Sequence, residues 1–98
     1  MVRALMADPN VALLDTRPSE EFAVGHLPRA INTPLETLES GKLVLAKSKL
    51  YVAYCRGPYC IFADEAVAYL RERGFRATRI ELSPMDWEAA GEQVSRLV

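Results

Sequence analysis

The stretch YVAYCRGPYCIFADEAVAYLRERG, residues 51–74, runs from an apolar segment through two cysteines into a helical pattern. Residues 50–55 (LYVAYC) are rich in β-branched and aromatic side chains, which predicts a buried strand. From about Ile61 to Arg73 apolar side chains recur at helical spacing, and Gly74 then favours a left-handed C-terminal cap. A buried strand that leads through a short loop into an amphipathic helix is typical of an α/β fold.

The remainder of the chain continues this alternation of strands and helices. Besides the strand at 50–55, we predict strands at 11–15, 30–34 and 75–82. Besides the helix at 61–73, we predict helices at 1–7, at 17–26, from 34 onward and at 83–91. Strands that alternate with helices pair in parallel through right-handed crossovers, which places helices over both faces of the sheet. The sequence therefore predicts one α/β domain over residues 1–98, with an open parallel sheet of four or five strands.

Length, charge and cysteine content exclude several classes of protein. The chain has 98 residues, enough for one modest core, and its 12 basic and 13 acidic residues give a net charge of -1. That balance argues against direct binding of nucleic acid, and no apolar run approaches the roughly 20 residues of a membrane span. There is no signal-peptide pattern, and two cysteines are too few for a disulfide framework, so we expect a cytoplasmic protein. No metal is expected, because Cys55, Cys60 and His26 are fewer soft ligands than a structural zinc site needs.

Asp15 and Cys55 stand at the carboxyl ends of two predicted strands, where open α/β sheets bind their ligands. After Cys55, Gly57 and Pro58 permit a tight arc of backbone N–H groups, and the next helix adds its positive N-terminal end. With Arg56 adjacent, such a nest would lower the pKa of the Cys55 thiol below its usual value of about 8.5. Position alone leaves open a Cys55 that simply packs in the core, but the arc and the helix start favour a nucleophile.

Four segments of the sequence occur in a characteristic order. They are VALLDTRPSEEFAVGHLPRAINTP (11–34), with its Asp-x-Arg, Glu-Phe, Gly-His and Ala-Ile-Asn-x-Pro elements, then YVAYCRGPYC (51–60), AVAYLRERGF (66–75) and DWEAAG (86–91). Together they resemble the single-domain rhodaneses, a family of sulfurtransferases built on a parallel α/β sheet with a catalytic cysteine loop. The resemblance spans roughly residues 11–91 and is far more specific than a lone cysteine loop.

The resemblance implies a chemistry for the loop. Cys55 would be the nucleophile, and the substrate-binding loop would comprise Arg56, Gly57, Pro58, Tyr59 and Cys60. In such enzymes the thiolate takes a sulfane sulfur from a small donor such as thiosulfate or polysulfide and becomes a persulfide. A thiol or cyanide then accepts that sulfur, and neither a metal nor an organic cofactor is required.

Other residues of the matched segments are expected to support this loop rather than react. Asp15 and Arg17 would fix the strand end through charge-assisted hydrogen bonds, and His26 would organise a turn. Phe22 and Trp87 are expected to anchor the core. The charged run at 71–79 is expected to form a solvated face.

The loop departs from the family at one position. Many rhodaneses carry arginine five residues after the cysteine, where this chain has Cys60, so a contact to an anionic donor is missing, and Arg56 is the hypothetical substitute. Cys60 either packs inertly at the helix start or, if its Cα lies within about 7 Å of that of Cys55, resolves a persulfide as a redox or sulfane-sulfur sensor. The CRGPYC loop is also similar to rhodanese domains fused to winged-helix regulators of the arsenic-repressor type. That similarity implies an attached regulatory domain, which alone would contact DNA.

Two other functions stay open from the sequence. Cysteine-loop phosphatases and arsenate reductases share this architecture, but their loop closes with an arginine, and here no arginine follows Arg56 until Arg71. A binding module without catalysis is the other alternative, and the retained cysteine argues against it. We therefore predict sulfur transfer ahead of both.

Overall fold

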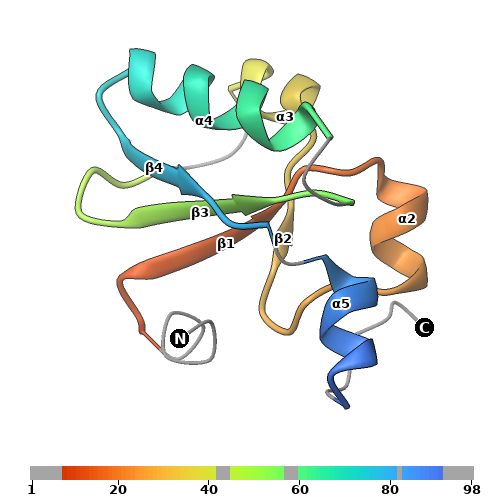
Figure 1. The fold of residues 1–98 in the computed structure, drawn as a ribbon. Coiled ribbons are helices and arrows are strands. Elements are labelled where there is room, and N and C mark those ends of the chain that lie inside the picture. Colours follow the sequence, from red (N-terminus) through yellow and green to blue (C-terminus); the bar gives the residue numbers. More distant parts are fainter. Residues whose placement is uncertain (1–7, 42–44, 57–59, 82, 92–98) are drawn as a thin grey trace.

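The computed structural model describes residues 8–41, 45–56, 60–81 and 83–91. Its centre is a sheet of four parallel strands in the order β2-β1-β3-β4. The strands are β1 (Val11–Asp15), β2 (Ile31–Asn32), β3 (Leu50–Tyr54) and β4 (Arg76–Arg79). The predicted open parallel α/β sheet is confirmed, with four strands in the described part of the chain (Figure 1).

Four helices connect and cover these strands. They are α2 (Ser19–Val24), α3 (Leu35–Glu39), α4 (Phe62–Glu72) and α5 (Pro84–Ala89). In Figure 1, α3 and α4 lie over one face of the sheet, and α5 lies on the opposite side, next to α2. The prediction of helices on both faces is therefore confirmed. None of the helices in the described ranges is long and apolar enough to cross a membrane.

Alternating side chains of the central strands build two cores, one on each face of the sheet. Leu14 and Ala53 pack with Leu70 of α4 in the larger core. Their strand neighbours Leu13 and Val52 point the other way, into a core with Leu27, Tyr54 and Trp87. This period of two is the expected geometry of a strand that is buried on both faces. Trp87 and Phe22 are both buried, as predicted.

Helix boundaries follow local capping chemistry. Gly74 has φ +83°, the left-handed conformation that glycine adopts without a steric penalty, and it ends α4 as predicted. The Ser83 side chain accepts a hydrogen bond from the Asp86 amide while the Asp86 carboxylate accepts one from the Ser83 amide, which caps α5. Pro18 lies at the N-cap of α2, so the helix predicted at 17–26 begins at Ser19 and ends at Val24.

Several predicted elements are shorter in the structure. The strand predicted at 30–34 is only β2, because Pro34 has no N–H for a ladder and α3 begins directly after it. The helix predicted from 34 onward ends at Glu39, and the strand predicted at 75–82 ends at Arg79. The predicted leading helix at 1–7 lies outside the described residues.

The strand register aligns the carboxyl ends of β1, β2 and β3 at one edge of the sheet. Asp15 is opposite Tyr54 of β3 and Asn32 of β2. The residue after β1, Thr16, donates from both its amide and its hydroxyl to the Tyr54 carbonyl, which ties the two strand ends together. Cys55 follows Tyr54 directly, so it lies at the same carboxyl edge of the sheet as Asp15.

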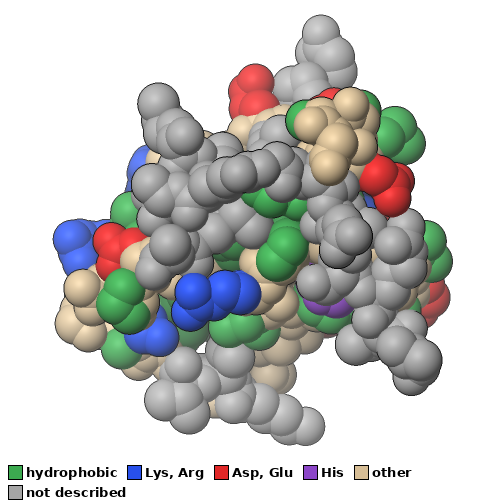
Figure 2. Space-filling model, turned by 90° about the horizontal axis from the view of Figure 1, so that it is seen from below, with side chains coloured by type: hydrophobic (Ala, Val, Ile, Leu, Met, Phe, Trp, Pro, Cys, Tyr) green, Lys and Arg blue, Asp and Glu red, His purple; other side chains and the backbone are tan. Residues whose placement is uncertain are grey.

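Charged groups of both signs occur on the surface of the described residues. The face in Figure 2 shows basic, acidic and apolar side chains interspersed among the described residues.

Candidate active site

Cys55 and Cys60 lie together between β3 and α4. Their sulfur atoms form a disulfide, and their Cα atoms are 6.2 Å apart. Cys55 is only 2% exposed and belongs to the core cluster under α4, against which Cys60 also packs. The distance condition for a pair of exchanging thiols is therefore met. Cys60 lies just before the helix, whose N-cap is Ile61.

The rest of the predicted loop is only partly described. Gly57, Pro58 and Tyr59 lie outside the described residues, so the cradle of backbone donors expected there stays a prediction. Arg56 is described and exposed. Helix α4 begins at Phe62, two residues after Cys60, and the positive end of a helix dipole favours an anion near its first turn.

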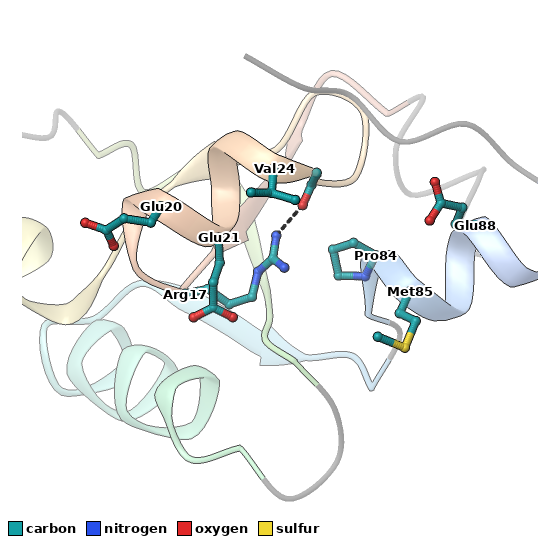
Figure 3. A pocket seen from close by; sticks show the side chains of 8 residues that line it. Arg17, Glu20, Glu21, Val24, Pro84, Met85 and Glu88 are labelled. Atoms are coloured by element: carbon teal, nitrogen blue, oxygen red, sulfur yellow. Dashed lines mark hydrogen bonds between the residues drawn. The ribbon is translucent and has the colours of Figure 1, made fainter. Parts of the chain in front are cut away.

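The Asp15 carboxylate is the centre of a buried polar network. Asp15 is fully buried and accepts hydrogen bonds from the Arg17 amide, from Arg17 Nε at 3.0 Å and from Arg17 Nη2 at 2.7 Å. Arg17 Nη2 also donates to the Gly25 carbonyl at the end of α2, as the dashed line in Figure 3 shows. Burial lowers the pKa of Arg17, but its hydrogen bond to Asp15 and the Asp15 charge outweigh that effect and raise it. The predicted charge-assisted hydrogen bonds at this strand end are thus present.

Tyr54 completes this network, and sequence reasoning missed it. Its hydroxyl donates to Asp15 Oδ2 at 2.9 Å and accepts the Leu27 amide N–H at 3.0 Å. Burial, followed by the adjacent Asp15 charge, raises the pKa of Tyr54, so the phenol stays a donor. The available signal was a tyrosine inside a buried strand, because a buried phenol needs a hydrogen-bond partner.

Replacing Tyr54 with phenylalanine is expected to lower the free energy of unfolding by about 1–2 kcal/mol. The change leaves the ring in place but removes the acceptor of the buried Leu27 amide and one donor to Asp15. Urea unfolding measures it. Tyr69→Phe is the matched control, because the Tyr69 hydroxyl bonds the Leu38 carbonyl from a partly exposed position. An equal loss in both variants would contradict a special role for the Tyr54 network.

Asn32 is a second residue that the sequence did not single out. Its side-chain amide donates to the Arg17 carbonyl at 2.9 Å and to the Asp15 carbonyl at 3.3 Å. It therefore holds the chain between Asp15 and Arg17 against β2. Its position next to the Thr-Pro pair that ends β2 was the available signal.

His26 is buried beside α2. Its Nδ1 lies 2.8 Å from the Phe22 carbonyl, which can only accept, so this ring nitrogen donates. The imidazole also stacks on the Phe22 ring with 3.7 Å between centroids. The predicted hydrogen bond that organises this turn is present, and both contacts direct the ring toward α2.

Arg56 lies at the rim of the loop, and its charge is already paired. Its Nε donates to Glu21 Oε1 at 2.7 Å, and its Nη2 forms an ion pair with Glu21 Oε2. Its guanidinium also lies over the Phe62 ring, 5.2 Å from the centroid. The hydrogen bond from Arg56 lowers the pKa of Glu21, and the same bond raises the pKa of Arg56. An anionic donor would therefore compete with Glu21 for this cation.

Arg79 corrects the expectation that 71–79 is a solvated face. Its side chain is only 14% exposed, and its Nη1 donates to the Cys60 carbonyl at 2.6 Å and pairs with Asp64 at 3.0 Å. Ala77 of the same run is buried in the core. Strand β4 turns these residues inward, because alternate side chains of a strand covered by α4 must face that helix.

Two open cavities lie near Arg56 and Glu21: Glu21 lines the first, and Phe62, under the Arg56 guanidinium, lines the second. The first, about 450 Å³, lies between α2 and α5 and is lined by Arg17, Glu20, Glu21, Val24, Gly25, Pro84, Met85 and Glu88 (Figure 3). The second, about 360 Å³, lies beside α3 and the start of α4 and is lined by Thr16, Pro18, Pro34, Leu35, Glu36, Glu39, Phe62 and Glu65. Carboxylates outnumber cations in both.

Comparison with known proteins gives this site a family. Residues 1–90 match the rhodanese-like domain family. The Bacillus subtilis protein YtwF, named as a candidate sulfurtransferase, is 33% identical over 82 residues, which cover 84% of this chain and 78% of that protein. An HTH-type transcriptional regulator of Mycobacterium tuberculosis is 41% identical over 81 residues, 83% of this chain but 36% of the regulator.

Solved structures agree on the fold. The BH2092 protein of Bacillus halodurans superimposes with a TM-score of 0.84 at 26% identity, over 97% of this chain and 70% of that one. A rhodanese-like domain protein of Staphylococcus aureus gives a TM-score of 0.76 at 24% identity, over 99% of this chain and 91% of that one. The sheet order, the cysteine between β3 and α4 and the match over residues 1–90 lead to one conclusion. This chain belongs to the rhodanese-like domain family.

Proposed function

We propose that this domain is a sulfurtransferase that carries a sulfane sulfur as a persulfide on Cys55. The observation that carries the proposal is the place of Cys55 in a rhodanese-like domain, directly after β3 and before α4. Its donor would be a small sulfane-sulfur compound such as thiosulfate or polysulfide, and its acceptor a thiol or cyanide. The candidate sulfurtransferase among the relatives supports this class of reaction.

The reaction is a double displacement at sulfur. The Cys55 thiolate attacks the outer sulfur of the donor, an S–S bond to Cys55 forms, and the remainder of the donor leaves with the electron pair of the broken bond. The acceptor then attacks that outer sulfur, and the electron pair of the second broken bond returns to Cys55 as a thiolate. No base is needed once the thiol is ionised, and neither step calls for a metal or cofactor.

A persulfide would join the transferred sulfur to Sγ of Cys55. In the structure, Sγ of Cys55 is bonded to Sγ of Cys60. Transfer requires this bond to be open, which the thiols of a reducing cytoplasm would maintain. The buried Asp15, Arg17 and Tyr54 network would hold the end of β1 against the end of β3 throughout.

A second candidate function is sensing of sulfane sulfur by the Cys55–Cys60 pair. The Cys60 thiolate would attack Sγ of a Cys55 persulfide, hydrosulfide would leave with the electron pair, and the disulfide would form. The disulfide seen between the two residues favours this candidate. The chain spans about a third of the length of the regulator that it resembles, so such a sensor would be one part of a longer protein.

One mass measurement tests both candidates. The reduced wild type and Cys60→Ser are incubated with thiosulfate or polysulfide, and the intact masses are recorded before and after a thiol reductant. For a transferase, we expect both proteins to gain one sulfur atom that the reductant removes. For a sensor, the wild type would instead lose two hydrogens while Cys60→Ser gains the sulfur. If neither protein gains sulfur from any donor, both proposals are wrong.

A further inference from the structure

In the part of the chain that the structure describes, three arginines stand at the carboxyl edge of the sheet, and each is bound to a carboxylate. Arg17, just after β1, pairs with Asp15 at 2.7 Å. Arg79, the last residue of β4, pairs with Asp64 at 3.0 Å. Arg56, just after β3 and next to the reactive thiol, pairs with Glu21 of α2. Each of these three described cations is therefore already engaged by a carboxylate.

The three pairs differ in how readily a donor could open them. The Arg17 and Asp15 side chains are 9% and 0% exposed, so separating them would leave a charge buried and unpaired. Arg79 also holds the Cys60 carbonyl and is 14% exposed. Arg56 and Glu21 are 52% and 34% exposed, and water can solvate both when they separate. The Arg56–Glu21 pair is the one that competes directly with a substrate.

We propose that Glu21 is a specificity-determining residue, which neutralises Arg56 and so favours sulfane-sulfur donors of low negative charge over dianions such as thiosulfate. This inference rests on the proposed sulfur transfer at Cys55. Arg56 donates to both oxygens of the Glu21 carboxylate through Nε and Nη2, which form one edge of its guanidinium. The same edge could otherwise donate two hydrogen bonds to an oxyanion. A dianion must displace Glu21 or approach without this contact.

The surroundings add to this discrimination. Glu36, Glu39 and Glu65 line the cavity that Phe62 also lines, and the Arg56 guanidinium lies over the Phe62 ring. Repulsion between these carboxylates and a dianion is about twice that felt by a monoanion in the same place, because Coulomb energy is proportional to charge. We therefore expect the choice of donor to depend on the charge of the donor and not on its size.

A pair of donors that differ by one charge tests the proposal. Thiosulfate, a dianion, and methanethiosulfonate, a monoanion, would leave the same Cys55 persulfide and release sulfite or methanesulfinate with the electron pair. We measure kcat/KM for each with cyanide as the acceptor. In Glu21→Gln, we expect the value for thiosulfate to rise about three- to tenfold, and the ratio of thiosulfate to methanethiosulfonate to rise at least about threefold.

Two controls distinguish an effect of the Arg56–Glu21 pair from a general effect of removing negative charge. Glu20→Gln removes the same charge from the adjacent residue of α2, and we expect its ratio to change by less than about twofold. Adding Arg56→Met to Glu21→Gln removes the freed cation and should abolish the gain. An unchanged ratio in Glu21→Gln, or an equal rise in Glu20→Gln, would overturn the role of Glu21.

The outcome for this inference is distinguishable from that for sulfur transfer itself. If the wild type turns over both donors and Glu21→Gln leaves their ratio unchanged, only the specificity proposal is wrong. If neither donor adds sulfur to Cys55 in wild type or variant, sulfur transfer is wrong and the specificity proposal is overturned with it.

Discussion

Replacing Cys55 with serine is expected to lower sulfur-transfer turnover by at least about a thousandfold. A serine hydroxyl is almost entirely protonated at neutral pH and forms no stable bond to sulfane sulfur, so the covalent intermediate is lost. Steady-state kinetics with thiosulfate and cyanide measure the loss, and intact mass after donor treatment should show no added sulfur. Serine differs from cysteine by one atom, so the packing of position 55 under α4 is largely retained.

Cys60→Ser is the matched control for this loss. It removes the other sulfur of the same disulfide and leaves the proposed nucleophile in place. For a transferase, its turnover should stay within about tenfold of wild type. Loss of turnover in Cys60→Ser with retention in Cys55→Ser would assign the nucleophile to position 60. Far-UV circular dichroism of both variants verifies that any loss is chemical.

Replacing Asp15 with alanine is expected to lower the free energy of unfolding by about 3–5 kcal/mol. Arg17 would remain buried with its charge unpaired, and the Tyr54 hydroxyl would lose its acceptor. Asp15 is fully buried, so water cannot replace these contacts without opening the sheet end. Urea unfolding followed by circular dichroism measures the change.

Two further variants make this prediction decisive. Asp15→Asn keeps one oxygen acceptor but loses the charge, so we expect an intermediate loss and a protein that still folds if alanine prevents folding. Glu20→Ala removes an exposed carboxylate from nearby α2, and it should cost less than about 0.5 kcal/mol. If Asp15→Ala costs no more than Glu20→Ala, the buried network does not hold the strand ends together.

The fold was predictable because its signals are local. The β-branched and aromatic run before Cys55 predicts β3, and the helical spacing that ends at Gly74 predicts α4. Capping by Ser83 likewise depends on residues within one turn. Alternating strands and helices then restrict the topology to a parallel sheet. The strand predicted at 30–34 was too long, because Pro34 cannot donate to a strand ladder and instead precedes a helix.

By itself, the sequence determined the α/β fold and the place of Cys55 at the end of a central strand, because both depend on short-range patterns of side chains. Only the tertiary structure decided which polar groups meet. Tyr54 donates a hydrogen bond to Asp15, 39 residues away in the sequence, and Arg56 donates to Glu21, 35 residues away. Such pairs are set by strand register and by the place of a helix over the sheet edge, and no local pattern encodes those distances. Because Arg56 is adjacent to Cys55 in the sequence, we expected it to bind an anionic substrate. In the folded protein its guanidinium instead pairs with the Glu21 carboxylate.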